Sequence, residues 1–542
     1  MLDYNELAEL LFPNIKKPEY YEELYPERNI KSGAKVTRLA PSPTGFIHIG
    51  NLYGAFVDER LARQSDGVFF LRIEDTDEKR YVDGAVDAII SSLAFFGIDF
   101  DEGPKDGAYG PYYQSERTDI YQSFAKRMIA LGQAYPCFLT EDEIAGIRKE
   151  QEKGKETPGI YGKWAVNRDI SFEQAKTNIS SGIPYVIRLK SKGGSGQIHV
   201  EDGIRGLLSM PENDQDIVIL KTNGVPTYHF AHVVDDHLMR TTHVVRGEEW
   251  LSSLPVHVEL FNMLGFTLPV FCHTAQLLKL DAEGNRRKLS KREDPELSLE
   301  YYMRKGYHPK ALREYLLTIL NSNFEEWRDK NPDGDIFGFP FSVEKMSSSG
   351  ALFDLNKLND ICKDVLLKIP ADGLRKFIIN WSKTFKPEVT SLLENDEVYI
   401  EKILDIGRSG NNPRKDLIYA EQIFECVNYF FDEYFTVTDE IPQNVTGSDA
   451  NAILSAYLET YDHGDDQAKW FEKIRALSAA LGYAARPKDF KNDPDKYKGH
   501  VGDVSTVIRI ALMGRSQSPD IWEIQQILGE RRTRQRIEMS LK

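Results

Sequence analysis

Residues 37–51 read TRLAPSPTGFIHIGN. Pro41, Pro43 and Gly45 lie close together, and such a run does not form regular structure because proline removes a backbone donor and glycine relaxes the chain. The apolar residues before the run predict a short strand, and the residues after it repeat apolar side chains at helical spacing. The stretch is therefore predicted to be a shaped loop that joins a strand to the start of a helix.

The same succession of strand, polar tip and helix returns further along the chain. An uninterrupted apolar run over 68–71 is typical of a strand buried on both faces, and residues 216–239 and 242–253 repeat the pattern. In open parallel sheets, ligands bind beyond the carboxyl ends of the strands. The polar residues expected at these ends are Arg38, Glu74, Tyr228, His232, Arg246 and Glu249.

The rest of the chain has different patterns. Residues 116–214 mix helical and strand-like stretches and contain a Gly/Ser-rich turn, which favours a domain inserted into the α/β fold. From about residue 300 onward, apolar residues recur mostly at helical spacing, as in 304–320, 355–369 and 417–434. We therefore expect a Rossmann-like α/β domain with an inserted α+β domain, followed by an all-α C-terminal half.

Composition excludes several classes of protein. No segment approaches the roughly 18 uninterrupted apolar residues that span a bilayer, and the acidic amino-terminal residues lack the basic start and apolar run of a signal peptide. The four cysteines lie far apart, without CxxC spacing. We expect a cytoplasmic protein with no membrane partner, no disulfide framework and no compact zinc site.

The net charge of −16 speaks against indiscriminate binding to nucleic acid, because a phosphate backbone favours a basic surface. Two basic clusters, 286–292 and 531–536, are nevertheless compatible with a local basic groove. A solvated helix end explains the second cluster equally well.

Two short motifs suit phosphate chemistry. His48 directly precedes the predicted helix and lies beside Gly50, an arrangement suited to a phosphate chain at a helix N-terminus, where free N–H groups favour negative charge. A basic segment after the last strand–helix unit reads KLSKR over 288–292, and its two lysines suit a triphosphate. Each motif taken alone is also explained by a turn or surface loop that binds nothing.

Together, HIGN and KLSKR resemble the HIGH and KMSKS signatures of class I aminoacyl-tRNA synthetases. The chain also contains, in the order and approximate spacing typical of bacterial-type glutamyl-tRNA synthetases, RLAPSPTGFIHIGN, LRIEDTD, GPYYQSER, PTYHFAHVVDDHLM, VVRGEEW, KLSKR and FDLNKL. This resemblance covers nearly the whole chain from about residue 35. The loop APSPTG departs from the PPEPxG-type loop usual in glutaminyl enzymes and in archaeal or eukaryotic glutamyl enzymes.

The resemblance implies a domain organisation that extends the pattern described above. Its parts are an N-terminal extension over 1–33, the Rossmann-like catalytic domain in two parts over 34–115 and 215–275, an inserted tRNA acceptor-binding domain over 116–214, a KMSKS loop and stem-contact domain over 276–370, and a helical anticodon-binding domain over 371–542.

The resemblance also implies the reaction. A glutamate–tRNA ligase uses ATP, accompanied by Mg²⁺, to convert L-glutamate to glutamyl-adenylate and transfers the glutamyl group to the 3′ end of tRNA-Glu, releasing AMP and pyrophosphate. The carboxylate of the substrate attacks the α-phosphorus, so positioning and charge stabilisation suffice. We expect a monomer. The sequence leaves open whether the enzyme charges only tRNA-Glu or also tRNA-Gln.

Individual residues carry over from the family's motifs. The residues implied in catalysis are His48, Asn51, Lys288 and Lys291. The implied glutamate pocket comprises Arg38, Ser42, Glu74, Tyr228, His232 and Arg246. The implied ATP site comprises Pro41, Ser42, Gly45, His48, Gly50, Asn51, Glu249, Leu278, Lys288, Ser290 and Lys291, and Arg414 is the candidate anticodon contact.

The chain departs from the family at the zinc site that many relatives carry in the inserted domain. A CxC pair and a later Cys/His pair hold that zinc, but here only Cys137 remains and Leu139 occupies its partner's position. No histidine occurs between residues 49 and 198. We therefore expect no zinc.

Three alternatives stay open at this point. A smaller HIGH-type nucleotidyltransferase would not need the long helical region after KLSKR, and a truncated paralogue that transfers glutamate to a tRNA base would lack it. A noncatalytic tRNA-binding protein is the alternative from a different class. Loss of the motif histidine or of the second lysine would favour it, and both residues are present.

Overall fold

The computed structural model describes residues 4–45, 47–290, 292–408 and 413–541. The chain divides into two compact units, which are described separately below. The first comprises Met1–Glu300 with Arg313–Asp354, and the second comprises Tyr301–Leu312 with Leu355–Lys542.

Parallel strands form the centre of the first unit. Strands β1 (Val36–Leu39) and β2 (Val68–Leu71) pair in parallel, with Val36 opposite Val68. The Thr242 amide donates to the Val36 carbonyl at 2.9 Å and brings the edge of a second sheet beside β1. That sheet has the strand order β6 (Gly206–Pro211), β5 (Gln197–Asp202), β9 (Val270–Thr274) and β8 (His243–Gly247).

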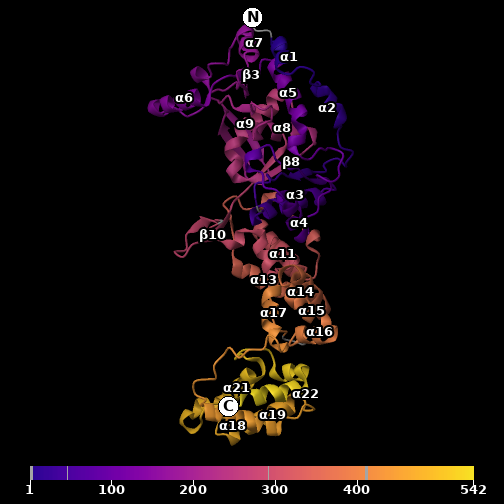
Figure 1. Cartoon of the computed structure of the whole chain (residues 1–542), viewed down its shortest axis with the longest axis vertical. Helices are drawn as coiled ribbons and strands as arrows, with labels where there is room; N and C mark the ends of the chain where they lie inside the picture. Colours follow the sequence, from indigo (N-terminus) through magenta and orange to yellow (C-terminus); the bar gives the residue numbers. More distant parts are fainter. Residues whose placement is uncertain (1–3, 46, 291, 409–412, 542) are drawn as a thin grey trace. The chain divides into compact units, whose positions relative to one another are not determined.

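The predicted βαβ arrangement is confirmed at the opening loop. Helix α3 (Ile49–Gln64) connects β1 to β2 and buries most of its surface, as expected of a helix packed in the centre of a domain. Four further helices belong to this region, and α5, α8 and α9 pack against one another (Figure 1). Their bounds are α4 (Ala85–Phe95), α5 (Thr118–Ala130), α8 (Tyr228–Leu238) and α9 (Leu254–Leu264).

A smaller antiparallel sheet crosses the sequence boundary predicted at residue 214. Its order is β3 (Ala134–Cys137), β4 (Val186–Leu189) and β7 (Val218–Leu220), and it is accompanied by α6 (Glu141–Gly154) and α7 (Phe172–Ser180). Ile187 pairs with Leu220, while residues 197–211 contribute β5 and β6 to the larger sheet. Sheet pairing therefore joins the segment 116–214 to the surrounding fold.

The N-terminal segment is part of the core of the first unit. Helices α1 (Tyr4–Leu11) and α2 (Pro18–Leu24) pack on α5 (Figure 1). Leu7 and Phe12 belong to the same buried cluster as Phe124 of α5. Glu22 accepts hydrogen bonds from His237 at 2.7 Å and from Arg240 at 3.0 Å. The segment thereby fastens the carboxyl end of α8.

The region after β9 begins with a hairpin. Its strands are β10 (Leu277–Leu280) and β11 (Arg286–Lys288), and β12 (Ala351–Leu352) pairs with β10 on the other side. Helices α10 (Leu299–Lys305), α11 (Pro309–Leu320) and α12 (Phe324–Lys330) follow the hairpin. The pattern over 304–320 therefore contains a break, because Gly306 has a φ of +75° and Pro309 starts a new helix.

The second unit is helical, which confirms the predicted helical C-terminal half. One continuous buried cluster joins most of its helices. After α13 (Leu355–Leu367) they are α14 (Ala371–Phe385), α15 (Thr390–Asn395), α16 (Glu397–Asp405), α17 (Ala420–Val427), α18 (Gly447–Thr460), α19 (Gln467–Ala480), α20 (Pro487–Asn492), α21 (Val501–Met513) and α22 (Ile521–Ser540). The pattern over 417–434 gives a shorter helix than its apolar spacing indicates, since α17 ends at Val427.

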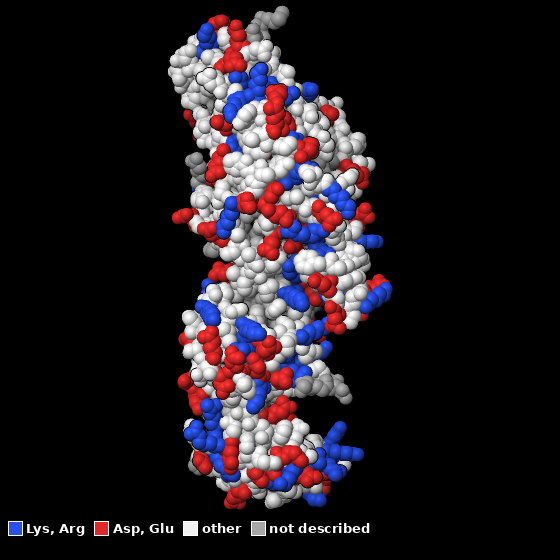
Figure 2. All heavy atoms as spheres, turned by 90° about the vertical axis from the view of Figure 1, so that its right-hand side faces the viewer, with Lys and Arg blue, Asp and Glu red and all other residues white. Residues whose placement is uncertain are grey.

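Charge is mixed over the surface. On the face shown in Figure 2, lysine and arginine side chains form small groups among acidic ones. Within the described ranges, no helix combines the length and the apolar character needed to cross a lipid bilayer.

Candidate active site

The opening loop lines a cavity of about 200 Å³. Gly45 has a φ of +144°, in the region that favours glycine, so a residue with a Cβ would strain the loop here. The Glu74 amide donates to the Pro41 carbonyl at 3.0 Å and fastens the loop to the end of β2. The residues that line the cavity are Pro41, Ser42, Thr44, Gly45, Ile47, His48, Asn51 and Ile89.

Five of the predicted ATP-site residues therefore line one cavity, and a sixth lies beside it. His48 is the N-cap residue of α3, and the Asn51 side chain accepts the His48 backbone N–H at 3.1 Å. A Cβ on Gly50 would approach the His48 ring to 3.0 Å, so glycine keeps the backbone close to that ring. The cavity lies at a helix N-terminus, where unpaired N–H groups favour an anion.

Backbone pairing joins the chain that follows the KLSKR segment to this loop. Ser298 forms an isolated antiparallel bridge with His48. Leu278 and Lys288, both predicted to border ATP, are opposite each other in the β10–β11 hairpin. The Ser290 amide donates to Asp294 at 2.8 Å. Lys291, predicted to be catalytic, lies outside the described residues.

Arg38, at the end of β1, belongs to a buried charge network. Its Nε donates to Asp236 Oδ1 at 3.1 Å, and its Nη2 lies 3.3 Å from His232 Nδ1. Arg72 bridges the same Asp236, at 2.7 Å, to Glu74, at 3.1 Å. The network thus joins three of the residues predicted to form the glutamate pocket.

The two carboxylates of this network have different electrostatic surroundings. Burial raises the pKa of Glu74, and the charges of Arg72 and Arg38 limit that rise. Burial also works to raise the pKa of Asp236, but the same two arginines lower it below its ordinary value. Asp236 is therefore a fixed negative charge, whereas a further cation near Glu74 would stabilise its ionised form.

Tyr228 and His232 lie on the same face of α8, as residues four apart do. Their rings stack with centroids 5.7 Å apart, and Trp250 packs on Tyr228 at 4.6 Å. Burial and the charge of Arg38 hold the pKa of His232 well below its ordinary value, so the ring is neutral. His232 Nε2 is buried and has no hydrogen-bond partner among the described residues.

Arg246, at the end of β8, is held by two histidines that the sequence reasoning missed. Its Nε donates to His273 Nε2 at 2.9 Å and its Nη1 lies 2.9 Å from His257 Nδ1. His273 is directly opposite Arg246 in the parallel β8–β9 register, and His257 comes from α9. The apolar run over 270–272 that precedes His273 was an available signal, but the strand register was needed to place this histidine beside Arg246.

The remaining predicted residues lie in less enclosed positions. Glu249 is exposed and turns back toward Gly247, where an added Cβ would lie 2.3 Å from Glu249 Oε2. Arg414 forms an ion pair with Asp416 and its amide donates to the Gly407 carbonyl at 2.8 Å. Contacts within the second unit therefore hold Arg414.

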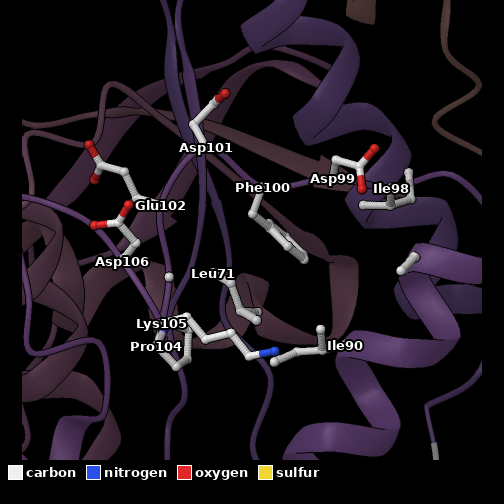
Figure 3. A pocket seen from close by; sticks show the side chains of 12 residues that line it. Leu71, Ile90, Ile98, Asp99, Phe100, Asp101, Glu102, Pro104, Lys105 and Asp106 are labelled. Carbon is white, nitrogen blue, oxygen red and sulfur yellow. The ribbon is translucent and has the colours of Figure 1, made fainter.

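A second cavity, of about 240 Å³, shares no lining residue with the first (Figure 3). Its rim carries several acidic side chains, but Asp101 pairs with Arg63 at 2.6 Å and Glu102 pairs with Arg28 at 2.7 Å. These pairs indicate a structural role for Asp101 and Glu102.

In the part of the chain that the structure describes, no group of three or more His, Cys, Asp or Glu side chains is arranged to hold a metal ion. Cys137 is a buried free cysteine. The expectation about zinc stays a prediction.

Comparison with known proteins places these features in a family. The family model described as "tRNA synthetases class I (E and Q), catalytic domain" matches residues 35–359, and the model described as "Anticodon binding domain" matches residues 414–541. The second match counts against the nucleotidyltransferase and the truncated paralogue, which lack such a domain.

Relatives named glutamate–tRNA ligase match along the chain. The protein from Acetivibrio thermocellus is 61 % identical, with 100 % of each chain covered, and the one from Thermus thermophilus is 36 % identical, covering 93 % of this chain and 99 % of the relative. The crystal structure of a glutamate tRNA ligase from Elizabethkingia meningosepticum in complex with its amino acid has a TM-score of 0.73 at 27 % identity, covering 94 % of this chain and 99 % of that chain. The chain therefore belongs to the class I glutamyl-tRNA synthetase family.

Proposed function

We propose that this chain activates L-glutamate with ATP at the cavity of the opening loop and transfers the glutamyl group to the 3′ end of tRNA-Glu. The observation that carries the assignment of the amino-acid site is the Arg246 guanidinium. It is only 9 % exposed, and its Nη2 has no hydrogen-bond partner among the described residues. A buried N–H group of a cation without an acceptor is costly unless a ligand supplies one.

Glutamate has two carboxylates and an ammonium group, and the residues around Arg246 include counterparts for the side-chain carboxylate and for the ammonium group. Arg246 binds the side-chain carboxylate, because a guanidinium offers several donors and no acceptor. Arg38 faces the same carboxylate, but Asp236 already balances its charge. Glu74 binds the ammonium group, whose positive charge favours the ionised form of this buried acid. Ser42, Tyr228 and His232 complete the pocket.

ATP lies along the loop and the start of α3. His48 and Asn51 contact the phosphates, and Lys288 and Lys291 stabilise negative charge that develops on them. Mg²⁺ accompanies ATP and neutralises part of the phosphate charge. An oxygen of the glutamate α-carboxylate bonds to the α-phosphorus and pyrophosphate leaves. The terminal ribose hydroxyl of tRNA then attacks the adenylate carbonyl and AMP leaves.

The other parts of the chain bind tRNA in this proposal. The inserted domain over 116–214 holds the acceptor end, the region over 276–370 contacts the stem, and the helical domain over 371–542 reads the anticodon. Arg414 takes part in that reading only if it exchanges its pairing with Asp416 for a base. The enzyme acts as a cytoplasmic monomer.

The test compares glutamate with glutamine, which have nearly the same shape. Arginine pairs with both carboxylate oxygens of glutamate but meets the amide NH₂ of glutamine with a donor. Arg246→Gln should lower kcat/KM for glutamate in tRNA charging by about thirtyfold or more, which corresponds to about 2 kcal/mol. Residual use of glutamine should fall much less or rise.

The matched control is Arg63→Gln, which removes an arginine that pairs with Asp101 at the surface of the same unit. This variant should keep the wild-type preference for glutamate. An equal loss for both amino acids in Arg246→Gln would mean that Arg246 supports the fold or the tRNA and does not read the side chain.

A further inference from the structure

The partners of Arg246 differ in charge from the partners of its neighbours. Arg38 and Arg72 both form buried ion pairs with Asp236. Arg246 forms no ion pair with any carboxylate of the described residues. It forms hydrogen bonds with His257 and His273 at 2.9 Å each, and the uncharged Tyr228 hydroxyl also interacts with it. Arg246 also contacts the uncharged ring of Phe271, whose centre lies 4.8 Å from the Arg246 Cζ.

Hydrogen-bond chemistry fixes the protonation of both histidines. Arginine only donates hydrogen bonds, so each nitrogen that faces Arg246 must be an acceptor that carries no proton. These acceptors are His273 Nε2 and His257 Nδ1. The proton of His273 is then on Nδ1, which donates to Asp202 at 2.6 Å. The proton of His257 is on Nε2, which donates to His229 Nδ1 at 3.0 Å. A continuous chain therefore runs from Asp202 to His229 through Arg246.

Each imidazole in contact with Arg246 is neutral. Burial lowers the pKa of His257 well below its ordinary value, and the neighbouring His232 and Arg246 lower it further. Burial also lowers the pKa of His273, although Asp202 opposes that shift. A protonated ring would turn a donor toward the guanidinium and add a like charge beside it.

A neutral acceptor and a carboxylate have different consequences for substrate binding. A carboxylate beside Arg246 would compensate its charge, and the substrate carboxylate would then add a second negative charge to a satisfied pair. Neutral imidazoles satisfy two N–H groups and leave the positive charge uncompensated. They also leave Nη2 as the guanidinium nitrogen without a partner among the described residues.

We propose that His257 and His273 are positioning residues that orient Arg246 while leaving its charge available, and that they thereby set the preference for glutamate over glutamine. This inference rests on the role proposed above for Arg246. His257 and His273 act through Arg246 and need not touch the substrate.

Two substitutions of nearly identical shape separate charge from packing. The side-chain oxygen of asparagine can accept a hydrogen bond where His257 Nδ1 lies, and aspartate has the same shape with a negative charge. His257→Asn should leave the KM for glutamate within about threefold of wild type. His257→Asp should raise that KM by at least about tenfold, since a tenfold change needs only about 1.4 kcal/mol and an adjacent charge supplies more. The KM for ATP should stay unchanged in both variants.

A second pair and a control make the test independent of one site. His273→Gln and His273→Glu repeat the comparison at Nε2 of the other ring. His273→Glu should again have the higher KM for the substrate glutamate. His243 lies on the same strand as Arg246 but bonds to Thr242, at 2.9 Å. His243→Asn and His243→Asp should therefore have the same KM for glutamate as each other.

The Arg246→Gln background identifies the route of the effect. There, His257→Asp should no longer change the ratio of kcat/KM for glutamate to that for glutamine, because the two residues act as one unit. Equal KM values for His257→Asn and His257→Asp would overturn the inference, as would a charge effect that persists in the Arg246→Gln background. If Arg246→Gln alone leaves the preference intact, the proposed function of Arg246 fails instead.

Discussion

Asp294 holds Arg287 through two parallel hydrogen bonds, at 2.6 and 2.7 Å, and so closes the base of the KLSKR segment. The same carboxylate accepts the Ser290 amide at 2.8 Å and Lys279 Nζ at 3.2 Å. The Arg287 hydrogen bond contributes most to holding the pKa of Asp294 far below its ordinary value. One buried carboxylate therefore organises Arg287 and Ser290, the residues on either side of Lys288 and Leu289.

Asp294→Asn should lower kcat for tRNA charging by about tenfold, because a neutral amide weakens the charge-assisted bonds that shape the segment. Steady-state charging with saturating ATP measures this effect. The control is Glu293→Gln, which changes the adjacent, largely exposed carboxylate at 3.6 Å from Arg287. A kcat equal in both variants would argue against a role of Asp294 in ordering the segment.

Lys291→Ala should reduce kcat by roughly 10²-fold with a much smaller change in KM, if this lysine acts on charge that develops mainly in the transition state. The prediction rests on the sequence motif, since Lys291 lies outside the described residues. Lys31→Ala, at a surface ion pair with Asp66, should retain the wild-type kcat. An unchanged kcat in Lys291→Ala would remove this lysine from the mechanism.

The N-terminal segment should contribute directly to stability. Leu7 of α1 is 1 % exposed, and its replacement by alanine should lower the free energy of unfolding by about 2–5 kcal/mol. Leu24 of α2 is 49 % exposed, so Leu24→Ala should change that free energy by about 0.5 kcal/mol or less. Hydrogen exchange of α5 amides provides the measurement. Similar protection in the two variants would show that α1 does not stabilise α5.

Asp236→Asn should destabilise α8 by about 3–5 kcal/mol near neutral pH, because it leaves Arg38 and Arg72 buried without their shared counter-charge. The native pKa of Asp236 is lowered, so its stabilisation is complete above the unfolded carboxyl pKa of about 3.9 and is lost as the pH falls through the native value. The difference between wild type and variant should therefore shrink in acid.

Hydrogen exchange of α8 at neutral and acidic pH measures that difference. Asp77→Asn changes an exposed ion pair with Arg80 and should show little effect at either pH. A wild-type advantage that grows in acid would contradict the assigned ionisation of Asp236.

Elemental analysis of the purified protein should find no stoichiometric zinc, because only Cys137 remains of the ligand set that relatives use. Treatment with a chelator should likewise leave the unfolding temperature unchanged. One zinc per chain would show that other residues of the chain supply the ligands.

Local pattern was sufficient for the elements next to the site. The apolar run over 68–71 is strand β2, and the repeat after the opening loop is helix α3. Such elements can be predicted from neighbouring residues, since the spacing of apolar residues within a short stretch of sequence indicates a strand or a helix. The break at Gly306 was missed because the apolar spacing on either side continues across it.

The sequence by itself determined the family, the helical C-terminal half and the motifs that line the cavity, because each depends on residues close together or on their order. Only the tertiary structure decided the pairing of β7 with β4, the packing of α1 and α2 on α5 and the partners of Arg246. His257 and His273 reach Arg246 from a helix and a neighbouring strand. Strand register and helix packing bring these residues together, and no local periodicity encodes such contacts between distant segments.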